Sequence, residues 1–221
     1  MSDGFTSSRP RAILFDWDNT LVDSWPVIHQ SLNATLVAFD QEPWSLEETR
    51  RRVRRSLRDS FPDLFGDRWT VAAEFFYEQF AALHLKALKA RPGAGDMLRT
   101  LHGSGIYLGV VSNKKGEYLR AEAAKLDWSR YFGSIIGALD AAKDKPARDP
   151  VDMALAESGL DAGQDVWFVG DTDVDLECAV TAGCVPILVR LEVPGPDEFG
   201  PFAPAHHVTD CQALCNLVHE L

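Results

Sequence analysis

Five short apolar runs, separated by amphipathic stretches, constrain the fold of this 221-residue chain more than any other feature. Each run is nearly continuous in aliphatic or aromatic residues and lacks the polar alternation of a strand with one exposed face. Such strands are typical of a parallel sheet that helices cover on both faces. Helical patterns such as KGEYLRAEAAKLD lie between the later runs, so the sequence predicts a doubly wound α/β domain with a parallel sheet. The runs are AILFD (12–16), YLGVVS (107–112), SIIGA (134–138), VWFVG (166–170) and PILV (186–189).

This alternation is broken once, between the first run and the second. Far more residues lie between Asp16 and Tyr107 than the roughly 30 that a complete βαβ unit needs, so a further segment is inserted there. The inserted segment has helical patterns throughout, from the apolar stripe of WPVIHQSLNATLVAF to the aromatic-rich WTVAAEFFYEQFAALHLKAL. Between these two, SLEETRRRVRR begins with Ser and Glu at the spacing of a capping box. The sequence therefore predicts a helical cap domain at residues 22–91, inserted into a core domain formed by residues 11–21 and 92–221.

Composition and charge narrow the class of protein. The chain is 46% hydrophobic, which suffices for one core or for a core domain with a smaller one. No apolar run is long enough to span a bilayer, so we expect no membrane partner. Residues 1–10 are polar and lack the hydrophobic centre of a secretory signal, so we expect them to form a frayed tail. The four cysteines lack zinc-site spacing and indicate reduced thiols in a cytoplasmic protein. A net charge of −11 argues against a nucleic-acid partner, and an anionic substrate must then be held by local positive charge.

Polar side chains follow three of the predicted strands at the point where each strand ends. The carboxyl ends of parallel strands share one crevice, so these side chains should converge although they are distant in the sequence. Several carboxylates in one pocket repel each other unless they are protonated or bound to a metal, and oxygen ligands of this kind suit Mg²⁺. The sequence therefore predicts a carboxylate nucleophile and a magnesium site where the first strand ends. The residues are Asp16, Asp18, Ser112, Asn113, Asp171, Thr172, Asp173 and Asp175.

Four short motifs occur in a fixed order along the chain: DWDNT (16–20), VVSN (110–113), KP (145–146) and GDTDVD (170–175). With these motifs, the chain resembles the haloacid dehalogenase superfamily, specifically its phosphatases with an inserted helical cap, and is similar to phosphoglycolate phosphatases. The resemblance covers roughly residues 12–190, and four motifs in order are specific although each alone is weak. It implies a Rossmann-like α/β core and Mg²⁺-dependent hydrolysis of a small phosphorylated metabolite, such as phosphoglycolate, through an aspartyl-phosphate.

The resemblance also implies a role for each motif residue. Asp16 would attack phosphorus, and Asp18 would protonate the leaving alcohol and later deprotonate the hydrolytic water. Mg²⁺ would bind Asp16, Asp171 and the backbone carbonyl of Asp18, while Asp175 would position a metal-bound water. The residues expected to bind the phosphoryl oxygens are Thr20, Ser112, Asn113 and Lys145, with Lys145 as the cation that offsets developing charge.

Some assignments keep a rival. An Asp after a strand is often a helix N-cap, but N-caps do not explain Asp, Ser and Lys at one edge of a sheet. Lys143 competes with Lys145, which we prefer because Pro146 follows it directly, as in the family. Asp173 has no assigned role, and we expect it either to contact the metal ligands without binding the metal or to lie in solvent. The histidines lie in helical patterns or near the C-terminus, and none is expected to be a catalyst.

The cap contains one unusual local signal, because RRRVRRSLR has six arginines within nine residues of an acidic protein. Charge runs are usually solvated faces. If Leu46, Val53 and Leu57 form a buried stripe on one helix, Arg50 falls within that stripe and Arg54 lies at its edge, while the neighbouring arginines point away. Arg50 and Arg54 are therefore the candidates for binding a carboxylate on the substrate, since guanidinium pairs bidentately with such groups.

Other functions remain to be weighed against hydrolysis. A dehalogenase is disfavoured, because that branch neither uses magnesium nor carries the second aspartate, here Asp18. A sugar phosphomutase of the same superfamily shares Asp18 and the cap, and stays open. A non-catalytic phosphoryl-sensing or scaffold protein would also gather Asp, Ser and Lys at strand ends, but receiver domains lack a cap. Arg54 and Arg148 replace a Gly and a Pro that are common in relatives, and these replacements change which side chains border the substrate. We expect the protein to be a monomer or a homodimer.

Overall fold

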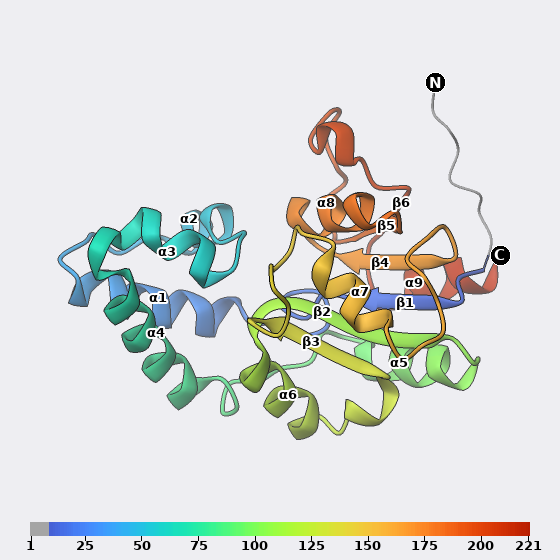
Figure 1. Ribbon diagram of the computed structural model, residues 1–221, viewed down its shortest axis with the longest axis horizontal. Helices are drawn as coiled ribbons and strands as arrows, with labels where there is room; N and C mark the ends of the chain where they lie inside the picture. Colours follow the sequence, from blue (N-terminus) through green and yellow to red (C-terminus); the bar gives the residue numbers. More distant parts are fainter. Residues whose placement is uncertain (1–8) are drawn as a thin grey trace.

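The computed structural model describes residues 9–221, so most of the tail expected at residues 1–10 lies outside the described residues. One parallel sheet of six strands forms the centre, in the order β3-β2-β1-β4-β5-β6 (Figure 1). The five predicted strands are confirmed; β2 extends beyond the predicted end, and β6 adds a strand too short for a sequence pattern to reveal. The strands are β1 Ala12–Phe15, β2 Tyr107–Lys115, β3 Ser134–Ala138, β4 Val166–Gly170, β5 Val185–Val189 and β6 His206–Val208.

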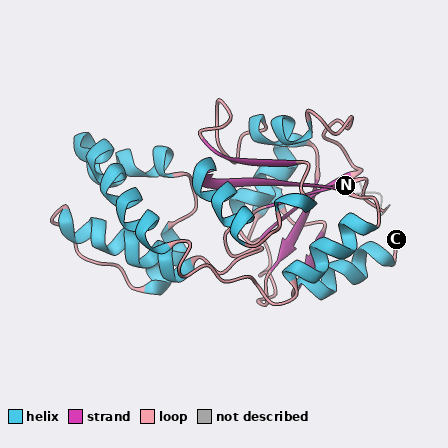
Figure 2. Cartoon of the chain, turned by 90° about the horizontal axis from the view of Figure 1, so that it is seen from below, coloured by secondary structure: helices cyan, strands magenta, loops and turns pink. Residues whose placement is uncertain are grey.

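Helices cover both faces of this sheet, which confirms the doubly wound α/β class (Figure 2). Ile13 and Phe15 of β1 pack against one layer, whereas Ala12 and Leu14 pack against the other. All four side chains are fully buried, because successive residues of a strand point to opposite faces and both faces are covered. The first layer contains α5 Ala94–Gly103, α6 Gly116–Lys125 and α9 Cys211–His219; the second contains α7 Asp149–Leu155 and α8 Asp173–Ala182.

Four helices from the inserted segment lie together beyond the carboxyl ends of the strands (Figure 1). They pack around a core of their own that includes Leu36, Phe61 and Phe65. The chain enters and leaves this layer side by side, because Val22 and Ala90 form an antiparallel bridge. The bridge lies next to the expected boundaries of the cap, and the boundaries themselves stay a prediction. The helices are α1 Trp25–Ala38, α2 Leu46–Arg52, α3 Leu57–Phe65 and α4 Trp69–Leu83.

The arginine-rich segment is divided between two of these helices, so the expectation of one continuous helix is wrong. Helix α2 begins as predicted, since the Oγ of Ser45 accepts a hydrogen bond of 3.1 Å from the backbone N–H of Glu48. It ends at Arg52, because Val53 adopts extended backbone angles, and α3 begins only at Leu57. Side chains on either side of Val53 therefore do not follow a single helical stripe.

The remaining segments are short turns and loops. The 3₁₀ helices span Gly66–Arg68, Ser129–Tyr131 and Gly200–Phe202. The last of these lies in the long loop between β5 and β6, where the sequence is rich in Gly and Pro. Across residues 9–221, no helix combines the length and the apolar character that crossing a bilayer requires.

Candidate active site

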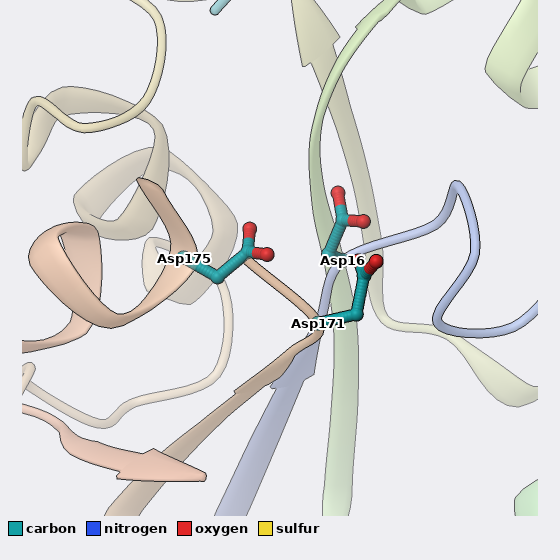
Figure 3. Close-up of side chains that lie close together, drawn as sticks. All are labelled: Asp16, Asp171 and Asp175. Carbon is teal, nitrogen blue, oxygen red and sulfur yellow. The ribbon is translucent and has the colours of Figure 1, made fainter. Parts of the chain in front are cut away.

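Three aspartates meet at the carboxyl edge of the sheet (Figure 3). Asp16 follows β1 and Asp171 follows β4, and these strands pair in parallel with Phe15 opposite Val169. The backbone N–H of Asp16 continues this pairing with a 2.9 Å hydrogen bond to the carbonyl oxygen of Val169. Asp175 reaches the same point from the first turn of α8, and carboxylate oxygens of the three residues lie within 4.8 Å of one another. The crevice that the sequence predicted does bring these carboxylates together.

Asp175 is held in place by the turn between β4 and α8. One of its oxygens, Oδ2, accepts hydrogen bonds from the backbone N–H and the hydroxyl of Thr172, at 3.0 and 2.8 Å. The strand must pass very close to this carboxylate, since a Cβ added to Gly170 would lie 2.3 Å from the Cβ of Asp175. The glycine at the end of VWFVG is thus required by a close approach between strand and side chain.

Lys145 provides the positive charge of this cluster. Its Nζ lies 2.6 Å from Oδ1 of Asp16 and 2.7 Å from Oδ1 of Asp175, and the side chain is buried. Lys143, the rival lysine, is exposed to solvent. Asn113 holds the Lys145 backbone from both sides, accepting from its N–H at 3.0 Å and donating to its carbonyl oxygen at 3.1 Å. With its amide oxygen and one amide hydrogen engaged in this way, Asn113 positions the lysine, and its expected contact with the phosphate stays a prediction.

The carboxylates carry more negative charge than Lys145 offsets. Burial raises the pKa of Asp16 to about 7; Lys145 opposes this increase, and the neighbouring carboxylates add to it. Burial, followed by the charges of Asp175 and Asp16, also raises the pKa of Asp171 well above its usual value. Burial alone would lower the pKa of Lys145, but the two carboxylates beside it raise that pKa, so the ammonium persists. When all three carboxylates are ionised, the one ammonium leaves two negative charges, and this set of hard oxygen donors fits a divalent cation such as Mg²⁺.

Two hydroxyl groups lie beside these charges, as the sequence predicted for side chains at this edge. The hydroxyl of Thr20 donates to Oδ1 of Asp171 at 3.3 Å. Ser112 is buried at the cavity, and its Oγ accepts a 3.3 Å hydrogen bond from the backbone N–H of Lys114. Since that contact uses the oxygen as an acceptor, the hydroxyl hydrogen of Ser112 is left to bind a ligand.

Asp18 lies outside the three-aspartate cluster and contacts a lysine that no motif marked. Its Oδ1 is 2.6 Å from Nζ of Lys114, and the same Nζ is 2.6 Å from Oε2 of Glu122. Glu122 also accepts a 2.7 Å hydrogen bond from the indole N–H of Trp17, while its Oε1 lies 2.9 Å from Nδ1 of His84. Lys114, Glu122 and His84 are all buried, so a polar chain runs from Asp18 in the core to the end of α4 in the cap.

The sequence feature that could have revealed these contacts is the pair Lys114-Lys115, which directly follows the VVSN motif in a protein that is acidic overall. Burial acts to lower the pKa of Lys114, but the carboxylates of Asp18 and Glu122 together raise it above its ordinary value. Lys114 is therefore a permanent ammonium beside Asp18. No feature of the sequence pairs His84 with Glu122, because His84 lies in the predicted cap domain and Glu122 lies in the predicted core domain.

The cap contacts the core on one side through two ion pairs. Nε of Arg58 lies 2.6 Å from Oδ2 of Asp144, whose side chain is almost fully buried. Nη1 of Arg54 lies 3.5 Å from Oδ1 of Asp173, and both of these side chains are partly exposed. Asp173, which had no role from the sequence alone, thus binds the cap. An exposed pair of this kind contributes little stability, whereas the buried carboxylate of Asp144 depends on its partner.

On the other side, α4 of the cap packs against α6 of the core through aromatic rings. Tyr77 stacks on Tyr118 with 5.6 Å between ring centroids, and Phe80 meets Tyr118 edge to face at 5.4 Å. Between the ion pairs and these rings lies a cavity of about 490 Å³, lined by residues of both the cap and the core. Asp16, Asp18 and Lys145 are among the lining residues, so the cavity opens directly onto the charged cluster.

The cap arginines are placed differently from the sequence expectation. Arg50 is exposed and lies outside the cavity lining, with its guanidinium 6.0 Å from the ring centroid of Trp25. Arg54 does line the cavity, and so do Arg52 and Arg55, which were expected to point away. The reason is the end of α2 at Arg52, which removes the helical geometry on which that sorting depended.

The fold and the site together define a capped α/β enzyme with a buried acidic centre at the carboxyl edge of its sheet. A model of the haloacid dehalogenase-like hydrolase family matches residues 13–189, and the chain belongs to this family.

Curated relatives and solved structures agree with this assignment. The chain is 30% identical over 189 residues to phosphoglycolate phosphatase 1 of Pseudomonas aeruginosa, and the aligned region covers 81% of this chain and 69% of that protein. It is 30% identical over 195 residues to a phosphoglycolate phosphatase of Xylella fastidiosa, covering 86% and 84%. A HAD-superfamily hydrolase of Ehrlichia chaffeensis has a TM-score of 0.66 and 27% identity, covering 97% of this chain and 98% of that one. A predicted phosphatase of Clostridium acetobutylicum shares the fold with a TM-score of 0.85 at 24% identity, covering 97% and 100%.

Proposed function

We propose that this hydrolase is a Mg²⁺-dependent phosphatase, which hydrolyses a small phosphorylated metabolite through an aspartyl-phosphate on Asp16. The observation that carries this proposal is the cluster in which Lys145 bridges Asp16 and Asp175 beside Asp171. A phosphoryl group needs a nucleophile, a cation for its oxygens and a divalent metal in one place, and this cluster offers the residues for all three. Relatives named phosphoglycolate phosphatases support the same chemistry, and phosphoglycolate is one candidate substrate.

In the first step, a carboxylate oxygen of Asp16 attacks phosphorus. Lys145 holds Oδ1 of Asp16, which leaves Oδ2 to form the new O–P bond while the P–O bond to the leaving alcohol breaks. Asp18 carries the proton in this step and gives it to the departing oxygen. The ammonium of Lys145 and the hydroxyl of Ser112 offset the charge that develops on the phosphoryl oxygens.

In the second step, water attacks the phosphorus of the aspartyl-phosphate, and the bond between phosphorus and Asp16 breaks. Asp18 takes the proton from this water, and the carboxylate form that does so is the form that pairs with Lys114. The products are inorganic phosphate and the restored Asp16 carboxylate. Asp18 therefore serves as acid and then as base, which returns the enzyme to its starting state.

Asp16, Asp171 and Asp175 would hold Mg²⁺, together with the backbone carbonyl of Asp18 that the family resemblance implies. When bound, the ion supplies the two positive charges that the cluster lacks and reduces repulsion between a carboxylate nucleophile and an anionic substrate. Thr20 fixes Asp171 through its hydroxyl, so it acts on a metal ligand as well as on the phosphate it is expected to bind.

The test is phosphate release from a panel of small phosphate monoesters, measured with Mg²⁺ and with a chelator. Wild-type protein should release phosphate only with Mg²⁺, and Asp16→Asn should abolish release. Asp161→Asn is the matched control, because Asp161 is exposed and lies outside both the three-aspartate cluster and the cavity lining, and its activity should stay close to wild type. Release by Asp16→Asn at the wild-type rate would contradict the proposal.

The same assay separates the rival functions. A sugar phosphomutase would move phosphate to a second hydroxyl of a sugar phosphate without releasing it, and a scaffold protein would do neither. A cytoplasmic location and a monomeric or homodimeric state stay predictions.

A further inference from the structure

The cavity beneath the cap has two chemically different ends. Its floor carries the charged cluster around Asp16 and Lys145, whereas its roof combines many aromatic and aliphatic side chains with a smaller charged group, which is Arg52, Arg54, Arg55, Asp59 and Asp63. Seven aromatic side chains line it, most of them from the cap. Phe76 and Phe80 stack with 5.8 Å between their ring centroids. Any substrate with its phosphate on the floor therefore extends its leaving group toward aromatic rings.

The aromatic roof begins immediately beside the proposed general acid. Nζ of Lys114 lies 2.6 Å from Asp18 and 5.3 Å from the ring centroid of Phe80. The leaving oxygen must approach Asp18 to receive its proton, so the atoms attached to that oxygen come close to the Lys114 ammonium, over which the ring of Phe80 lies. The first part of the leaving group thus passes an ammonium and then the flat face of an aromatic ring.

The cavity has this size while the cap is in contact with the core. Arg58 contacts Asp144 on one side, and Tyr77 stacks on Tyr118 on the other. The volume of about 490 Å³ is therefore not the result of an open cap. Cavities of roughly 300–1,000 Å³ hold ligands of drug size. A leaving group as small as glycolate would leave most of this space unfilled.

The cations around the cavity are already paired with carboxylates. Arg52 pairs with Glu48 at 2.7 Å, Arg54 pairs with Asp173, and Lys115 pairs with Glu117 at 2.8 Å. Lys114 is shared by two carboxylates. Among the cationic lining residues that the structure describes, Arg55 is the exception, and it is exposed. A second carboxylate on the substrate would therefore compete with the carboxylates that these cations already bind, or rely on the exposed Arg55.

We propose that the preferred substrate is a phosphate monoester of an alcohol bearing a flat, uncharged aromatic ring, which binds against Phe76 and Phe80. This inference rests on the proposed phosphatase function and names the substrate class of the same site. The ring fills the space that glycolate cannot, and its burial adds binding free energy through apolar surface and aromatic contacts.

The experiment compares phosphate esters of primary alcohols, whose leaving groups react similarly, so that binding under the cap decides the difference. Wild-type enzyme with Mg²⁺ is given phenethyl phosphate, ethyl phosphate and phosphoglycolate, and kcat/KM is measured for each. The value for phenethyl phosphate should exceed the other two by at least about tenfold, since even one methylene in an apolar pocket can be worth that much.

Two substitutions on helix α1 locate the effect. Ile28 lines the cavity, whereas Val37 on the same helix is 60% exposed and lies outside the lining. Ile28→Asn should lower kcat/KM for phenethyl phosphate by about tenfold and change that for ethyl phosphate by less than about twofold. Val37→Asn should change neither value, and thermal unfolding of both variants checks that the cap remains folded.

The outcomes separate the two proposals. If ethyl phosphate or phosphoglycolate is hydrolysed as efficiently as phenethyl phosphate, the aromatic substrate class is overturned while the phosphatase function stands. An equal loss for both esters in Ile28→Asn would also overturn it, because the residue would then act without regard to the ring. If no ester releases phosphate, the phosphatase function fails and the substrate class fails with it.

Discussion

Replacing Lys145 with Met tests whether a buried ammonium holds the charged cluster together. The Nζ of Lys145 lies 2.6 and 2.7 Å from two carboxylates, and its side chain is 3% exposed. Met keeps much of the length and removes the charge, so Asp16, Asp171 and Asp175 would face one another without it. Removing one partner of a buried ion pair costs about 3–5 kcal/mol, because the remaining charge is left uncompensated. We expect the free energy of unfolding to fall by that amount.

Urea unfolding in the presence of a chelator measures this loss. For a slope near the middle of the range of ~1–3 kcal/mol/M, the midpoint should fall by about 2 M. Lys143→Met is the matched control, because it removes the same charge from an exposed lysine two positions away in the sequence, and it should change stability by less than about 0.5 kcal/mol.

Magnesium gives the same variant a second readout. A ligand that binds only the native state stabilises it, and the stabilisation grows with the logarithm of the ratio of the free ligand concentration to the dissociation constant. Without Lys145 the three carboxylates have no cation beside them, so saturating Mg²⁺ should stabilise Lys145→Met more than wild type, although phosphate release should be lost. If Lys145→Met unfolds in chelator at the same urea concentration as Lys143→Met, the ion-pair reasoning is refuted.

Three further predictions follow from the charges and the burial of single groups. Asp171→Asn should raise the stability of the metal-free protein at pH 8 and remove its stabilisation by Mg²⁺, because the raised pKa of Asp171 means that its charged form is disfavoured on folding; chelator-treated unfolding curves check this. Lys114→Met should lower kcat at least about tenfold for ethyl phosphate but much less for 4-nitrophenyl phosphate, whose leaving group needs no proton from Asp18; equal losses would contradict a positioning role. Burial raises the pKa of Cys184 to about 12 and that of Cys211 to about 11, so the native thiols should resist iodoacetamide at pH 8. Since unfolded thiols lose their protons near 9, stability should fall as pH rises above that value. Mass spectrometry of alkylated protein, native and unfolded, covers all four: Cys178, Cys184, Cys211 and Cys215.

Local patterns were sufficient for the core of the fold. The runs before Asp16 and Asp171 are apolar on both faces, and that property alone specifies strands covered on two sides. Because parallel strands end at one edge, the sequence also determined that these two carboxylates meet, and the structure places them within 4.8 Å together with Asp175. The short β6 was missed, since three residues carry no measurable periodicity.

The cap arginines show where such patterns stop being informative. The sorting of Arg50 from its neighbours assumed that one helix continues past Arg52, but the helix ends there. Nothing in the spacing of apolar residues marks that end, because Val53 and Leu57 fit a continued stripe equally well. Arg54 reaches the cavity through the turn between two helices, and its partner Asp173 lies in the other part of the chain.

The sequence by itself determined the sheet, the inserted helices and the residues that gather where the strands end, because each depends on neighbours in the chain or on the shared direction of strands. Only the tertiary structure decided which side chains connect the cap to that centre. His84 and Glu122 are 38 positions apart, and they meet at 2.9 Å because α4 packs on α6. The volume and aromatic character of the cavity have the same origin, since they are set by two packed surfaces that no single segment contains.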